Sequence, residues 1–135
     1  TMTRYVLIIS AALILITLLS CTRNNGGDSR LYGTWKLQRI SRAGVDDAAY
    51  QGNIFWKFQN QTIEMQQVNE LHNSLQTFGN YRLADETLFL SFPDADFPPL
   101  LSLPRESELQ IVELTGREMV LATGYPATMY YFKKW

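Results

Sequence analysis

The sequence has almost no cysteine and no excess of charge of either sign. Cys21 is the only cysteine in 135 residues, so an intramolecular disulfide is excluded. The 12 Lys and Arg residues are balanced by 13 Asp and Glu residues. A nucleic-acid-binding surface, which needs clustered basic residues, is therefore not expected. Hydrophobic residues make up 46% of the chain and aromatic residues 13%, a composition that argues against a disordered protein.

A long apolar run is found only near the N-terminus. After Arg4, residues 6–19 are apolar except for Ser10 and Thr17. As a helix they would be about 21 Å long, whereas a bilayer has a hydrocarbon core of about 30 Å. The run is therefore short for a membrane span and typical of the core of a signal peptide.

This run ends in LLSC, residues 18–21, which resembles the lipobox of bacterial lipoproteins. The resemblance implies cleavage before Cys21 and attachment of lipid to its sulfur and its new amine. Residues 1–20 are then a lipoprotein signal peptide, and residues 21–30 are the lipidated cysteine and a flexible polar tether. Thr22 is not the Asp that signals inner-membrane retention, which favours the outer membrane without fixing its face. The alternative is a chance cysteine behind an ordinary signal peptide or anchor.

The remaining chain, residues 31–135, is predicted to form short strands. Apolar and polar residues alternate in runs separated by turn signals such as those near Asn60, Asp85 and Gly116. Short turns favour antiparallel neighbours, and closure of the sheet removes its exposed edges. We therefore predict an all-β, compact eight-stranded antiparallel up-and-down barrel, with a sandwich as the rival fold. The predicted strands are residues 33–40, 53–58, 62–68, 74–83, 87–92, 108–114, 118–123 and 128–135.

Three segments of this region resemble a known family. They are GTWKL, which contains Gly33 and Trp35, then YRLADETLFL, and the final YYFKKW. Together with the tether they are similar to the lipocalin-like domains of small bacterial outer-membrane lipoproteins. The resemblance implies a barrel whose interior holds a small apolar ligand and whose floor is closed by Trp35. It also implies a basic residue across the Trp35 ring, for which Lys133 and Lys134 are the candidates.

The candidate ligand-binding residues are apolar side chains predicted to face the barrel interior, where they would stack on a flat or apolar ligand. The alternative is that these side chains simply fill a small barrel, since eight strands enclose just enough space for either outcome. The candidates are Trp35, Trp56, Phe58, Met65, Tyr81, Phe92 and Tyr131.

No residue pattern points to catalysis, to a metal or to a cofactor. His72 is the only histidine, and it lies in a polar stretch without the partners of a catalytic triad. The DAD sequence at Asp94–Asp96 is followed by prolines and lacks the glycine turn of a calcium loop. Paired carboxylates that meet in space are not visible in a sequence. We therefore expect a protein that is not an enzyme.

Two functions follow from this interpretation. The first is non-catalytic binding of a small apolar or amphipathic ligand by an envelope lipoprotein anchored to the membrane through Cys21. The second is a structural or protein-interaction role, in which the barrel is filled and an envelope protein partner binds its loops or outer surface. Two long connectors, 41–52 and 93–107, are candidate lids over a barrel mouth or simple caps. An exposed apolar patch within residues 97–103 would favour the second function.

Overall fold

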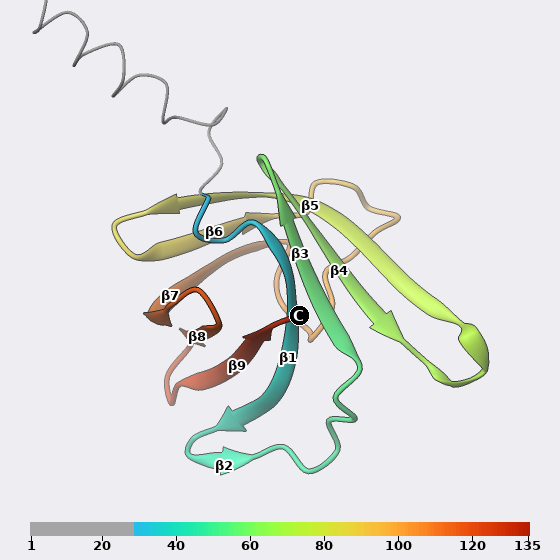
Figure 1. Cartoon of the computed structure of the whole chain (residues 1–135), viewed down its shortest axis with the longest axis horizontal. Helices are drawn as coiled ribbons and strands as arrows, with labels where there is room; N and C mark the ends of the chain where they lie inside the picture. The colour runs from blue at the N-terminus through green and yellow to red at the C-terminus, as the bar shows by residue number, and fades with distance from the viewer. Residues whose placement is uncertain (1–28) are drawn as a thin grey trace, which may run out of the picture.

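The computed structural model describes residues 29–135, which form an antiparallel β-barrel (Figure 1). Cys21, the predicted signal peptide and nearly all of the predicted tether lie outside the described residues. Within residues 29–135, no helix has the length and apolar character needed to cross a membrane.

Eight strands close the barrel, and a ninth, β2, is a short extension that pairs with β1. Each barrel strand pairs antiparallel with the next, and β9 returns to pair with β1. The predicted all-β, eight-stranded up-and-down barrel is therefore confirmed. The strands are β1 (Gly33–Arg42), β2 (Val45–Asp46), β3 (Ile54–Gln59), β4 (Thr62–Val68), β5 (Ser74–Ala84), β6 (Thr87–Ser91), β7 (Glu106–Leu114), β8 (Glu118–Thr123) and β9 (Thr128–Lys134).

Alternation of apolar and polar residues decides which side chains enter the core. In β3, Ile54, Trp56 and Phe58 are buried, while Lys57 between them is exposed. The β5–β6 turn places Asp85 and Glu86 at φ values of 50° and 61°, as a two-residue hairpin turn with the twist of the flanking strands requires. Each hairpin therefore presents one apolar face to the same interior.

A bulge interrupts the alternation in β1. Leu37 is level with Phe132 and Arg39 with Tyr131, so the residue between them, Gln38, has no partner in β9. An extra residue in one strand shifts which side chains point inward. As a result Leu37 and Ile40 are both buried, and β1 continues to Arg42, two residues beyond its predicted end.

The connections between strands divide the barrel into two ends. The described chain enters beside the β3–β4, β5–β6 and β7–β8 turns, and Lys134 ends β9 at the same end. We call this the entry end; the start of β1 and the end of β9 both lie there (Figure 1). The opposite, far end carries β2, the β4–β5 hairpin, the β6–β7 loop and the β8–β9 turn. The β4–β5 hairpin contains the short 3₁₀ segment η1 (Glu70–His72).

The β6–β7 loop, residues 92–105, closes part of the far end. Leu103 is buried in the core, and Leu100 and Leu101 are partly buried against it. Arg105 holds the start of the loop, because its guanidinium donates to the backbone oxygens of Phe92, Asp94 and Ala95 at 3.3, 2.7 and 3.1 Å. The loop therefore folds over the far end, where its leucines and the Arg105 hydrogen bonds hold it.

Candidate functional site

The floor of the barrel is built on Trp35. This side chain has no exposed surface, and its Nε1 donates to the backbone oxygen of Leu31 at 2.9 Å. Lys134 Nζ lies 4.5 Å from the centre of the Trp35 ring and donates to the backbone oxygen of Tyr32. The expected cation–π contact is thus confirmed for Lys134, whereas Lys133 is exposed. Desolvation lowers the pKa of Lys134 below its ordinary value.

The candidate ligand-binding side chains are packed against one another. Trp35, Trp56, Met65 and Phe92 have no surface accessible to water, and Phe58, at 1%, has almost none. A ligand-sized void beside them would leave accessible surface on its walls, so the space next to these side chains is filled. Two of the candidates, Phe58 and Tyr81, pack their rings in an edge contact with centroids 5.0 Å apart. A role for these residues in binding a ligand stays a prediction.

Tyr131 lies on the outer surface, so the prediction that it faces the barrel interior is wrong. The guanidinium carbon of Arg39 is 3.7 Å from the centre of the Tyr131 ring, and Arg39 also pairs with Asp46 at 3.0 Å. Both neighbours of Tyr131 in β9, Tyr130 and Phe132, are buried, so Tyr131 faces outward by alternation.

Three buried polar atoms lack a hydrogen-bond partner among the described residues: Tyr32 OH, Nε1 of Trp56 and Oγ1 of Thr77. The last two lie on β3 and β5, with β4 between them. Met65 is level with Trp56 on one side and with Thr77 on the other, so the two residues belong to one inward-facing row across β3, β4 and β5. Leaving such groups unpaired costs about 1–3 kcal/mol each, which marks this row as a polar feature of the core.

Several exposed large apolar side chains belong to the β4–β5 hairpin and the β6–β7 loop at the far end. Leu71 is 88% exposed at the tip of the β4–β5 hairpin, Leu75 is 54% exposed, and the Phe78 and Phe97 rings are 5.9 Å apart in an edge contact. We call the set Val68, Leu71, Leu75, Phe78 and Phe97 the apolar rim.

The rim differs from the patch considered in the sequence. Within residues 97–103, Phe97 is exposed, but the three leucines turn inward and pack against the core. Most of the rim instead comes from residues 68–78. The signal in the sequence is that Phe78 falls outside the inward-facing alternation of β5, whereas Leu71 lies in η1, where strand alternation gives no signal. The remaining exposed large apolar residues among those described are Val45, Val112, Tyr125 and Trp135.

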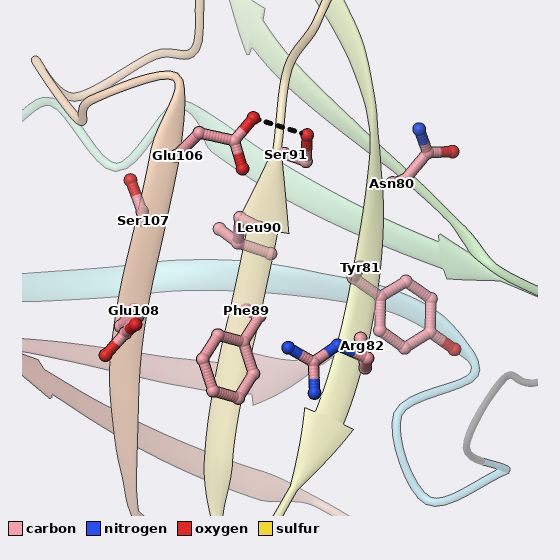
Figure 2. Close-up of a pocket in the computed structure, with 9 residues that line it drawn as sticks. All are labelled: Asn80, Tyr81, Arg82, Phe89, Leu90, Ser91, Glu106, Ser107 and Glu108. Carbon is pink, nitrogen blue, oxygen red and sulfur yellow. Dashed lines mark hydrogen bonds between the residues drawn. The ribbon is translucent and has the colours of Figure 1, made fainter.

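A shallow hollow of about 270 Å³ lies on the outer face of β5, β6 and β7 (Figure 2). Its outward side chains are polar except for Phe89, whose ring is covered by the guanidinium of Arg82 at 4.1 Å. Ser91 Oγ donates to Glu106 at 2.7 Å, a contact that Figure 2 also shows. No histidine lines this hollow, and the group that accepts from Ser91 is the carboxylate of Glu106. The hollow is lined by Asn80, Tyr81, Arg82, Phe89, Leu90, Ser91, Glu106, Ser107 and Glu108.

The acidic residues that suggested calcium form a local turn. Asp94 Oδ1 accepts a hydrogen bond from the backbone N–H of Asp96 at 2.9 Å, as in an Asx-turn. Within residues 29–135, no three His, Cys, Asp or Glu side chains come together as a metal site.

The fold and the sequence together define the class of protein. The sequence matches the family model of the lipocalin-like domain over residues 14–135, and the chain therefore belongs to the lipocalin-like domain family. This fold is typical of non-catalytic binding proteins and is compatible with a ligand-binding or a structural role.

Solved structures have the same fold. A lipocalin-like protein from Bacteroides uniformis superposes with a TM-score of 0.66 at 19% identity, covering 79% of this chain and 100% of its own. An uncharacterized protein from Bacteroides eggerthii gives a TM-score of 0.65 at 21% identity, covering 78% of this chain and 99% of its own. Identities this low carry the fold alone. No curated protein matches the sequence.

Proposed function

We propose that this protein is an envelope lipoprotein whose filled barrel serves as a scaffold and whose far end binds an envelope protein partner. The observation that carries the proposal is the contrast between the two surfaces of the barrel. The interior positions that would line a ligand cavity are occupied by their own side chains, with Trp35, Trp56 and Met65 fully buried. Large apolar side chains are instead exposed in the apolar rim, where burial against a partner would remove them from water.

The position of the rim agrees with a lipid anchor at Cys21. Residue 29 enters at the end opposite to the rim, and seven residues separate it from Cys21. A chain attached to a membrane at Cys21 would hold the rim away from that membrane. Two or more acyl chains would suffice for stable anchoring, because each buried CH₂ contributes about 0.8 kcal/mol.

The anchor is tested by changing its attachment point. Cys21→Ser removes the thiol and with it the lipobox, so the protein should lose its lipid mass and keep the apolar segment of residues 6–19. A mass that still includes lipid at residue 21 would contradict lipidation through the Cys21 thiol.

The interaction is tested by photo-cross-linking from the far end in intact cells. A photoreactive residue replaces Leu71, and the matched control replaces Val112, which is 56% exposed on β7. We expect a discrete cross-linked protein from position 71 and none from 112. The partner, once purified, should bind the parent chain and lose affinity for Leu71→Ser but not for Val112→Ser. Cross-links of equal intensity from both positions, or none from either, would contradict the proposal.

A second candidate, binding of an amphipathic ligand inside the barrel, is favoured by one observation. The unpartnered Trp56 Nε1 and Thr77 Oγ1 would gain hydrogen bonds from a ligand's polar group. The surrounding side chains would have to move apart to admit such a ligand. Its test is a Thr77→Val variant, which should bind a ligand more weakly if the hydroxyl recognises it and should bind equally if the hydroxyl is uninvolved.

A further inference from the structure

The edge of β5 is free along half its length. β5 pairs with β4 from Ser74 to Asn80, but it pairs with β6 only from Asn80 to Ala84. β6 ends at Ser91, and the chain then leaves the sheet at Pro93. The β4–β5 hairpin therefore extends past the β6–β7 loop, as Figure 1 shows. Among the described residues, no strand occupies the β6 side of residues 74–78.

The register shows which backbone groups face this edge. The Asn69 N–H donates to the Asn73 oxygen at 2.8 Å, so Asn69 and Asn73 are a hydrogen-bonded pair. In an antiparallel ladder every second pair is hydrogen-bonded, so the pair Gln67 and Leu75 is hydrogen-bonded as well. The intervening residues Ser74, Gln76 and Phe78 must direct their N–H and C=O groups to the opposite side. None of these three makes another backbone hydrogen bond among the described residues.

The side chains around the free edge combine apolar surface with negative charge. Leu75 and Phe78 are exposed on opposite faces of β5. Residues 62–80 and 93–104 contain no Lys or Arg, and their charged residues are Glu64, Glu70, Asp94 and Asp96. Lys57 lies across from Glu64 on β3. The guanidinium of Arg105 binds the backbone oxygens of Asp94 and Ala95 and places one positive charge beside the acids of the loop. With Glu70, Asp94 and Asp96 against this one cation, the segments around the edge keep a net negative charge.

We propose that the free edge of β5, residues 74–78, binds an extended protein segment that adds a strand to the sheet and carries apolar residues alternating with Lys or Arg. The inference deepens the proposed function, on which it rests, by naming the mode of binding and the chemistry of the partner. Backbone hydrogen bonds to Ser74, Gln76 and Phe78 supply affinity, as in other cases of strand addition. Contacts with the apolar rim and with the acidic border supply specificity.

Charge argues against the other occupants of this edge. A second copy of the chain would bring the same acidic border against Glu70, Asp94 and Asp96, which is unfavourable. An anionic lipid surface would be repelled for the same reason. A segment with basic residues is attracted instead.

The test uses a display library of random ten-residue peptides selected on the full chain in detergent. An enriched peptide is synthesised and its affinity is measured for variants at Gln76. Gln76→Pro removes the edge N–H without removing a bond to β4, and proline is tolerated at such edge positions. Gln76→Ala is the matched control, since it removes the side chain and keeps the N–H. Circular dichroism checks the fold of each variant.

A second variant protects the test against loss of folding. Ser74→Pro also removes an edge N–H, and Asn73 before it already has φ −79° and ψ 134°, the extended conformation that a residue preceding proline adopts. We expect enriched peptides that alternate apolar and basic residues. Both proline variants should weaken binding by about tenfold or more, whereas Gln76→Ala should change it by less than about twofold.

The outcomes separate the inference from the function on which it rests. Enriched peptides that bind Gln76→Pro and Ser74→Pro as tightly as the parent would overturn strand addition, while surface binding of a partner would survive. Enrichment of acidic peptides, or failure to enrich any extended peptide, would also overturn the inference. Absence of cross-links from Leu71 in cells would remove the proposed function itself.

Discussion

Replacement of Gly79 by alanine should destabilise the barrel strongly. A Cβ at this position would lie 2.4 Å from the backbone oxygen of Ser91 and 2.7 Å from Cδ1 of Phe92. The first neighbour is backbone in the strand that pairs with β5, so it cannot rotate away as the end of a side chain can. Overpacking of this kind costs about 1–3 kcal/mol, and we take the upper end because backbone must shift.

The net effect on stability can be estimated from two opposing contributions. Alanine restricts the unfolded chain more than glycine does, which offsets about 0.4–1 kcal/mol. The free energy of unfolding of Gly79→Ala should therefore fall by about 2 kcal/mol, measured by urea denaturation, with a decrease in Tm of about 10 °C for a domain of this size.

Gly116 provides the matched control. It lies in the β7–β8 turn, where a Cβ would meet no atom within 4 Å and where the backbone has no positive φ. Gly116→Ala should be neutral or stabilise by less than about 1 kcal/mol. Equal effects of the two substitutions would refute the close approach of β5 and β6 at Gly79.

Three further predictions concern side chains that fix the ends of the barrel. Lys134→Met should lower stability at neutral pH by about 1 kcal/mol, through loss of the cation–π contact. Because the pKa of Lys134 is lowered from 10.5, the unfolded chain binds more protons between the folded pKa and 10.5. The parent chain should therefore gain stability relative to Lys134→Met as pH rises through that window, in paired urea titrations; a constant difference would contradict this. Tyr50→Phe removes a hydroxyl that donates to the Leu37 oxygen at 2.6 Å and accepts from Ile54 N–H at 3.1 Å. It should cost about 1–2 kcal/mol in the same assay, and no loss would refute the role of these bonds. Arg105→Ala should speed amide hydrogen exchange in residues 93–104 while leaving β3 protected; exchange unchanged in the loop would show that the guanidinium does not hold it.

The barrel was predictable because its strands and turns are determined by residues close together in the sequence. Alternation in β3 and the turn residues at Asp85 and Glu86 set strand identity and pairing without reference to distant parts of the chain. The contact between Trp35 and a basic residue near the C-terminus followed from the family resemblance. The choice of Lys134 over Lys133 depends on inward alternation at the end of β9.

The surface features were less predictable because they depend on how strands meet in space. Tyr131 was predicted to face inward, but its outward position follows from the alternation of β9, because two successive tyrosines do not show by themselves which one points inward. The free edge of β5 exists because β6 stops at Ser91 while β4 continues beside β5 to Ser74. A strand that extends past its neighbour can be recognised only once the strand pairing is known. The alternation of residues within β5 does not show it.

The central claim is that the barrel interior is filled and that binding occurs on the outside. The most direct test is native mass spectrometry of the full chain after incubation with an extract of its own cell envelope. We predict the mass of the protein without an added small molecule, apart from its own lipid, for the parent chain and for Phe89→Ala on the outer surface. A discrete added mass that persists in Phe89→Ala and disappears in Trp56→Ala would place a ligand inside the barrel and contradict the account.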